Sequence, residues 1–544
     1  MNFRMIKTII YSFLLIQSIL FAQTDSIQLS NQYTLADTVK ANEYFNVGKS
    51  YQDKSKYDSS ITAFSEVEKI YAELLKNYDD KRLWLKLIQA KNYLGYNLCY
   101  QGLYDKSILY LEEAETLCKE KLGLDNKTAA QIYQAKGIYY DYTDDLNKSI
   151  EMFYKALEIR IRIFGEEHSD VADTYNSIGI IYSKKSNRDK ALEYFTRSLN
   201  IKKKVLGDEH SHTAAAYNNI GINYYERGDY GKALEYYYQS LSIRLKTIGE
   251  MHHLTASSYN NIGNCLNEIG EFDKAEENHL KALEIRKKVL GKDHDLVATS
   301  LTNLGLTSWR KGEYDKALEY LYLSMNIRLK KQKANHSDIA MNYMNIGVMH
   351  KAKNELDSAI SYCNKAIEIF KSTGDLKSVN VSKVYQNIAE TYLAKEKHDL
   401  SLSAIQNSMQ AIVFDFNDDN IESNPKFDLI LSEVQLLSAL KIKSKNYTAL
   451  SLSNDLSEAD KIKYLTKSLF LTELADSLID KMLAGFKNEN SKLFLGEKTK
   501  SIFEQGIDCL LYTSDAADER SSVDLGGRRI IKKKKHKRKK KKNI

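Results

Sequence analysis

The chain has 544 residues, of which 28% are charged and 43% hydrophobic, and its formal net charge is +7. Thirteen of the 79 Lys and Arg residues and four of the 72 Asp and Glu residues lie in 509–544, which leaves 66 basic and 68 acidic side chains in the rest. This near-neutral body excludes a fold that is basic throughout. A single proline, Pro425, argues against an all-β fold with proline-rich turns and favours helices.

The first 22 residues have the pattern of a secretory signal peptide. Arg4 and Lys7 provide a positive region, 8–21 is apolar, and Ala22 completes a small-residue cleavage site. The apolar run is shorter than the roughly 20 residues that a membrane-spanning helix needs. No later stretch is apolar enough to span a membrane, so we expect an exported protein, periplasmic or extracellular in a bacterium. We expect 23–41 to be an N-terminal linker.

A 42-residue repeat follows. Glycines recur at this spacing from Gly95 to Gly347, Ala389 takes the next position, and a looser unit surrounds Gly48. A small residue stands 12 residues after each of these positions, and another stands seven residues further on. Apolar spacing on both sides of a short polar turn, such as "SNRDK", predicts a helix–turn–helix unit. Glycine inside a helix costs about 1 kcal/mol relative to alanine, so its recurrence predicts a close approach of two helices.

These positions resemble the tetratricopeptide repeat in its 42-residue form, as in kinesin light chains and many bacterial proteins. HEAT-type repeats share the period but not the small-residue spacing. The resemblance covers 42–415, about nine units. It implies an all-α fold, a right-handed superhelical solenoid of helix–turn–helix repeats with a concave groove. One departure is the Gly-x-x-His sequence that stands where the family often has proline after the second helix.

Histidines and tyrosines also recur at the repeat period. A metal ion needs ligand nitrogens about 2 Å from one point, whereas one histidine per repeat distributes them along the chain. We therefore expect loop capping or packing by the histidines and core packing by the tyrosines, with no metal and no cofactor. The histidines are His168, His210, His252, His294 and His336, and the tyrosines are Tyr133, Tyr175, Tyr217, Tyr259, Tyr343 and Tyr385.

The resemblance assigns a further set of residues to the groove. Amides offer both a donor and an acceptor, so a ladder of them could bind the backbone of an extended peptide. The alternative is that these asparagines bond helix ends or neighbouring repeats. If they bind a partner, Ala at 219, 261 and 303 should abolish its capture and leave thermal stability nearly unchanged. The set comprises Asn176, Asn218, Asn219, Tyr225, Asn260, Asn261, Asn264, Asn267, Asn303, Trp309, Arg310, Asn345 and Asn387.

No catalytic constellation is evident in the sequence. We find no glycine-rich phosphate loop, HExxH, GxSxG or nucleotide fingerprint. The four cysteines before residue 509 are scattered, which favours buried thiols over a disulfide framework or a zinc site. Carboxylates stand beside lysines, as in "YDKALEY", which is typical of a solvated helix face. We expect a chain that is not an enzyme.

The C-terminal region begins where the period fails. We expect a linker over 416–430 and a truncated helical segment over 431–508. Two stretches, "ADSLID" at 475–480 and "SKLFLGEK" at 491–498, resemble the segment that precedes the caspase-like CHAT domain in bacterial repeat proteins. That peptidase domain would lie beyond this chain, and no position here matches its catalytic residues.

The tail, 509–544, resembles a translated sequencing adapter followed by poly-A, in which AAA codons give lysine. We interpret it as a disordered, non-native tail and expect no nucleic-acid partner. The alternative is a polybasic arm that binds nucleic acid or anionic lipid.

We expect the chain to be an exported scaffold that binds a peptide or partner protein in its concave groove. The resemblance makes it the sensing arm of a truncated CHAT-type peptidase protein. Two alternatives are the extracytoplasmic input arm of a sensor histidine kinase and a free-standing assembly scaffold.

Overall fold

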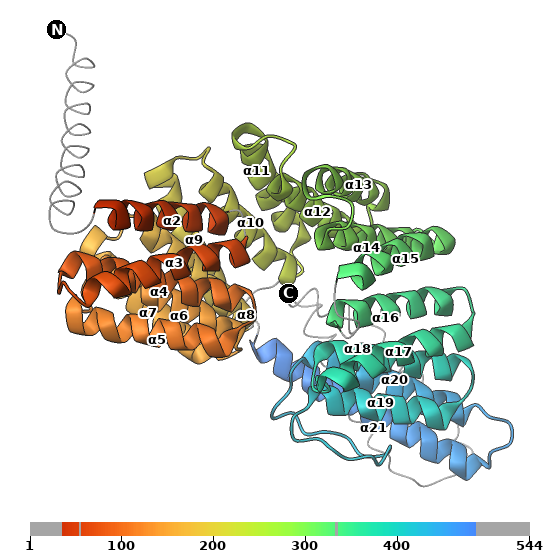
Figure 1. Ribbon diagram of the computed structural model, residues 1–544. Helices are drawn as coiled ribbons and strands as arrows, with labels where there is room; N and C mark the ends of the chain where they lie inside the picture. The colour runs from red at the N-terminus through yellow and green to blue at the C-terminus, as the bar shows by residue number, and fades with distance from the viewer. Residues whose placement is uncertain (1–34, 54–55, 186, 332–335, 486–544) are drawn as a thin grey trace, which may run out of the picture. The chain divides into compact units, whose positions relative to one another are not determined.

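The computed structural model describes residues 35–53, 56–185, 187–331 and 336–485 (Figure 1). Twenty helices, α2 to α21, account for almost all of this part of the chain, and its only β pairing is an isolated bridge between Val413 and Ile430. The predicted all-α fold is confirmed. The expected signal peptide, most of the N-terminal linker and the basic tail lie outside the described residues. The chain divides into two compact units, Met1–Asn223 and Tyr224–Ile544.

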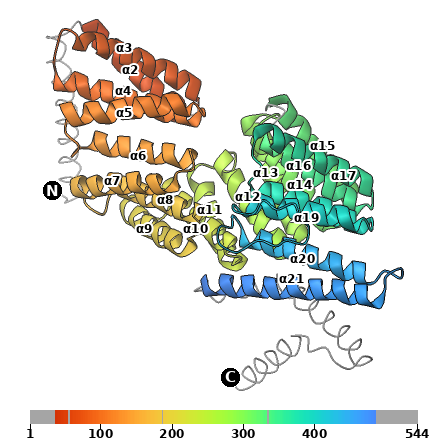
Figure 2. The same cartoon turned by 90° about the horizontal axis from the view of Figure 1, so that it is seen from below.

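Consecutive helices of the first unit pack as pairs, α2 with α3, α4 with α5, α6 with α7 and α8 with α9. Figure 2 shows these pairs stacked in chain order. Their bounds are α2 Leu35–Asp53, α3 Tyr57–Leu75, α4 Lys81–Tyr100, α5 Tyr104–Lys121, α6 Lys127–Tyr142, α7 Leu146–Phe164, α8 Ser169–Lys184 and α9 Arg188–Leu206; α10, Ser211–Glu226, spans the boundary of the units.

The second unit continues the same pattern, with pairs α12–α13, α14–α15, α16–α17, α18–α19 and α20–α21. The bounds are α11 Tyr230–Thr247, α12 His253–Glu268, α13 Phe272–Leu290, α14 Asp295–Arg310, α15 Tyr314–Lys331, α16 Ser337–Ala352, α17 Leu356–Thr373, α18 Val379–Ala394, α19 His398–Ile412, α20 Glu433–Ser451 and α21 Glu458–Gly485.

The recurrent glycines are points of close contact within their helix pairs. A Cβ atom added to Gly137 on α6 would lie 2.5 Å from the ring of Phe153 on α7, and one added to Gly179 would lie 2.7 Å from Phe195. Real Cβ atoms do not approach other atoms so closely, so only glycine lets the large side chain fill the space. The Ser149 hydroxyl, 12 residues after Gly137, donates to the Gly137 carbonyl at 2.8 Å. The close approach predicted from the glycines is confirmed.

The recurrent histidines cap helices. Nδ1 of His168 accepts a hydrogen bond from the backbone N–H of Asp170 at 3.1 Å, and the same bond recurs at His252 and His294. Each ring thus satisfies one of the N–H groups left unpaired at a helix start. Capping, one of the two roles predicted for these residues, is confirmed here. Among the described residues, no group of three or more His, Cys, Asp or Glu side chains is placed to hold a metal ion.

The segment expected to be a linker, 416–430, packs on the core of the second unit. Phe416 and Pro425 are buried, and the bridge from Val413 to Ile430 closes the base of the loop. The loop also covers Lys443 of α20, whose Nζ donates to the Ser423 carbonyl at 2.7 Å. The packing of this loop could not be predicted from the sequence pattern, because apolar residues in a loop do not recur with a regular period. The helices α20 and α21 therefore share one hydrophobic core with α18 and α19.

Candidate binding surface

The first helices of neighbouring pairs meet one another directly. Contacts join α4 to α6, α12 to α14, α16 to α18 and α18 to α20. The side chains of such neighbouring first helices therefore share one face, the first-helix face, where residues of two successive repeats can contact the same ligand. None of the described helices is long and apolar enough to cross a membrane.

Four of the predicted groove asparagines bond one another between repeats. Nδ2 of Asn219 donates to Oδ1 of Asn176 at 2.7 Å, and Nδ2 of Asn303 donates to Oδ1 of Asn260 at 2.9 Å. The two residues of each pair are 43 positions apart, so each bond links the first helices of successive repeats. For these four residues the structure provides the inter-repeat bonds that the sequence left as an alternative. Ligand binding through them stays a prediction.

The remaining predicted residues differ in exposure. Trp309 is 36% exposed and Arg310 is exposed, whereas Asn267 is buried and donates to Thr307 Oγ1 at 2.8 Å. Arg310 donates to the Asn267 carbonyl at 2.9 Å and pairs with Glu268 at 2.6 Å. Its guanidinium thus bonds to residues of the preceding repeat. Half-buried positions are Asn218, Tyr225, Asn261, Asn264, Asn345 and Asn387.

A ladder of buried cations was not foreseen from the sequence. Arg286 on α13 is 3% exposed, and its Nη1 donates to the Leu296 carbonyl at 3.1 Å and to Ser300 Oγ at 2.8 Å. Burial lowers its pKa to about 10. Each arginine of the ladder bonds from a second helix to the first helix of the next pair, whereas Lys202 pairs with Asp173 on the first helix of its own pair, so the ladder is architectural. Its members are Arg160, Lys202, Arg244, Arg286 and Arg328, and their 42-residue spacing was the signal that could have revealed them.

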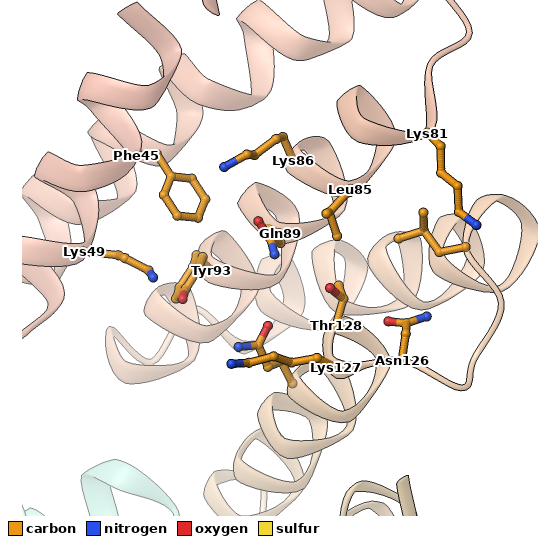
Figure 3. Close-up of a pocket in the computed structure, with 12 residues that line it drawn as sticks. Phe45, Lys49, Lys81, Leu85, Lys86, Gln89, Tyr93, Asn126, Lys127 and Thr128 are labelled. Atoms are coloured by element: carbon orange, nitrogen blue, oxygen red, sulfur yellow. The ribbon is translucent and has the colours of Figure 1, made fainter. Parts of the chain in front are cut away.

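The described part of the first unit also contains a pocket on the first-helix face (Figure 3). It has a volume of about 590 Å³ and lies between α2, α4 and α6. Its lining combines apolar, amide and cationic side chains: Phe45, Lys49, Lys81, Leu85, Lys86, Gln89, Tyr93, Leu122, Asn126, Lys127, Thr128 and Gln131. None of these residues was singled out in the sequence. The available signal was α4 itself, which has no acidic residue over Lys81–Tyr100.

The helix pairs, the glycine contacts and the face of first helices define a helical repeat solenoid. Family models described as tetratricopeptide repeat match 86–160, 142–204, 170–246 and 254–330, and a second such model matches 342–373. The chain therefore contains tetratricopeptide repeats, as the spacing of the small residues predicted. A search of curated proteins gave no match by sequence.

Solved structures with this fold include the apo form of RapI, at 21% identity over 69% of this chain and 97% of that one, with a TM-score of 0.51. The quorum sensor NprR from B. thuringiensis is 17% identical over 69% of this chain and 98% of that one, with a TM-score of 0.48. A putative kinesin light chain from Podosopora anserina, with nearly identical TPR-like repeats, is 20% identical over 38% and 98%, with a TM-score of 0.34.

Proposed function

We propose that this chain is an interaction scaffold whose first-helix face binds an extended segment of a partner protein. The observation that supports this proposal is the pocket between α2, α4 and α6 (Figure 3). Residues of all three helices line this pocket, so one extended segment, at about 3.3–3.6 Å per residue, can contact several successive repeats.

The pocket contains the groups that a peptide backbone needs. The amides of Gln89 and Gln131 make no hydrogen bond within the described residues, and each offers a donor and an acceptor. Phe45 and Leu85 add apolar surface for side chains. Apolar area with a few polar groups that orient the ligand is typical of sites for peptides and small molecules.

Two further parts of the proposal rest on the sequence. Residues 1–22 support export, so the partner would be met in the periplasm or outside the cell. The stretches 475–480 and 491–498 support a link to a CHAT-type peptidase domain, for which this scaffold would be the regulatory arm. The first stretch lies in α21 and the second lies outside the described residues.

Selection from a random peptide display library against the full chain tests the binding function. We expect selected peptides to lose affinity by about tenfold or more when Gln89→Ala and Gln131→Ala are combined. Gln239→Ala, an exposed amide of the second helix α11, is the matched control and should bind as the parent does. A library that yields no binder, or binders that the double variant retains, would refute the proposed surface.

Export and the effector have separate tests. Secretion followed by N-terminal sequencing should give Gln23 as the first residue of the mature protein. Sequencing the genomic locus across codon 509 should replace the basic tail with a continued reading frame that encodes a soluble domain with His and Cys. A transmembrane helix in that position would instead support the sensor-kinase alternative, and a stop codon would support a free-standing scaffold.

A further inference from the structure

The lysines of the pocket have no anionic partner among the residues that the structure describes. Lys49, Lys81, Lys86 and Lys127 line it, and none of them forms an ion pair within the described residues. No acidic side chain lines the pocket. Lys91, on the same helix as Lys86, differs, because Glu68 and Glu113 pair with it at 2.6 and 2.8 Å.

Two of these lysines place their ammonium groups near the same aromatic ring. The Nζ atoms of Lys49 and Lys86 lie 5.4 and 5.1 Å from the centroid of Phe45, and Lys49 Nζ also lies 5.7 Å from the ring of Tyr93. The ring quadrupole attracts each ammonium, but it does not neutralise them. Burial and the neighbouring charge of Lys49 lower the pKa of Lys86. An anion placed between the two ammonium groups would therefore remove a repulsion that the free protein retains.

We propose that this pocket binds a run of Asp or Glu side chains in the partner peptide, with the carboxylates placed at Lys49, Lys86 and Lys127. The inference rests on the proposed function and adds the charge of the ligand to it. Lysine ammonium groups form charge-assisted hydrogen bonds with carboxylates, and the three lysines lie on α2, α4 and α6, so one extended segment can reach all of them (Figure 3).

The aromatic rings favour an acidic peptide over a single-stranded nucleic acid. Nucleic acids bind such grooves by stacking bases on free ring faces. Here Lys49 and Lys86 lie over Phe45, and Tyr93 stacks on Phe64 at a centroid distance of 4.6 Å with Lys49 over it as well. A base could stack only after displacing a lysine, whereas a carboxylate approaches the ammonium groups as they stand.

Fluorescence anisotropy with a short labelled peptide that alternates Glu and Gly tests the inference on the full chain. The matched peptide carries Gln in place of Glu. We expect the Glu peptide to bind at low salt, the Gln peptide to bind at least about tenfold more weakly, and added salt to weaken the Glu peptide because it screens exposed charges. Equal binding of the two peptides would overturn the inference.

The variant Lys49→Met/Lys86→Met/Lys127→Met should bind the Glu peptide about tenfold or more weakly than the parent. Its thermal midpoint should equal or exceed that of the parent, because the substitutions remove like charges and retain the aliphatic stems. The control removes the same charge from exposed lysines of α3 and α5, through Lys69→Met, Lys106→Met and Lys119→Met. All three proteins keep the basic tail, so its contribution cancels in the comparison.

The other outcomes are equally decisive. An oligothymidylate or phosphatidylserine vesicles that bind through the same three lysines more tightly than the Glu peptide would overturn the acidic-peptide inference. So would library-selected peptides without acidic residues that still need Gln89 and Gln131, although the proposed scaffold function would then stand. A library that yields no binder at all would remove both.

Discussion

The substitution Gly137→Ala tests the close contact between α6 and α7, which recurs at equivalent glycines of other helix pairs. The new Cβ atom would meet the ring of Phe153 at 2.5, 2.6 and 2.9 Å, and Phe153 is only 2% exposed, so its ring has no free space to move into. Overpacking of this kind costs about 1–3 kcal/mol. Alanine gains about 1 kcal/mol over glycine from helix propensity. With contacts this short, we expect a net loss of about 2 kcal/mol in the free energy of unfolding.

Gly231→Ala is the matched control. Gly231 lies in helix α11, and a Cβ added there would meet only the Asp229 carboxylate, at 3.9 Å. Alanine should therefore leave stability unchanged or raise it by up to about 1 kcal/mol. Gly231 is the second residue of α11, so this control shows that Gly→Ala is tolerated where the new methyl group meets no side chain closely, and the packing contact itself is measured by a double-mutant cycle.

Urea denaturation followed by circular dichroism provides the assay, completed as a double-mutant cycle with Phe153→Ala. In the Phe153→Ala background the cavity accepts the new methyl group, so Gly137→Ala should become neutral or stabilising. Gly137→Ala that is harmless in the parent, or equally costly in both backgrounds, would refute the explanation of the glycine repeat.

Three further predictions concern single side chains of the second unit. Burial lowers the pKa of His279 to about 4, so the free energy of unfolding should fall by up to about 3 kcal/mol as the pH drops from 6.5 towards 4. Urea titrations at several pH values should show that His279→Leu removes this loss. Asn303→Ala breaks the bond to Asn260 and should cost about 1 kcal/mol, measured by the same titration, whereas Asn264→Ala should cost little. Burial lowers the pKa of Lys443 to about 7, so the stability of the parent should rise between pH 7 and about 10 relative to Lys443→Met, and parallel slopes for the two proteins would contradict this.

The asparagines illustrate how far sequence reasoning reaches. The period placed Asn219 and Asn303 at equivalent positions of the first helix, and equivalent positions recur on one face of the solenoid. The sequence could not decide between a ligand and a neighbouring repeat as their partner. The bonds to Asn176 and Asn260 now predict a stability cost for alanine, where the sequence predicted almost none.

The sequence by itself determined the helix pairs and the close contacts at the glycines, and it predicted capping as one of two roles for the histidines. These features depend on residues within one repeat, such as Gly137 and Phe153, and their short separations recur with every unit. A periodic signal over seven glycines specifies them because every unit must meet the same local steric requirement.

Only the tertiary structure decided which side chains of different repeats meet. Lys49, Lys86 and Lys127 are 37 and 41 residues apart, so they share no repeat position, yet the stacking of α2, α4 and α6 brings them to one pocket. The offset and rotation between stacked pairs set that convergence, and the repeat period carries no information about either. The physical reason is that a residue's position in the repeat determines which face of its helix it occupies, whereas its neighbours from other repeats depend on how the helices pack.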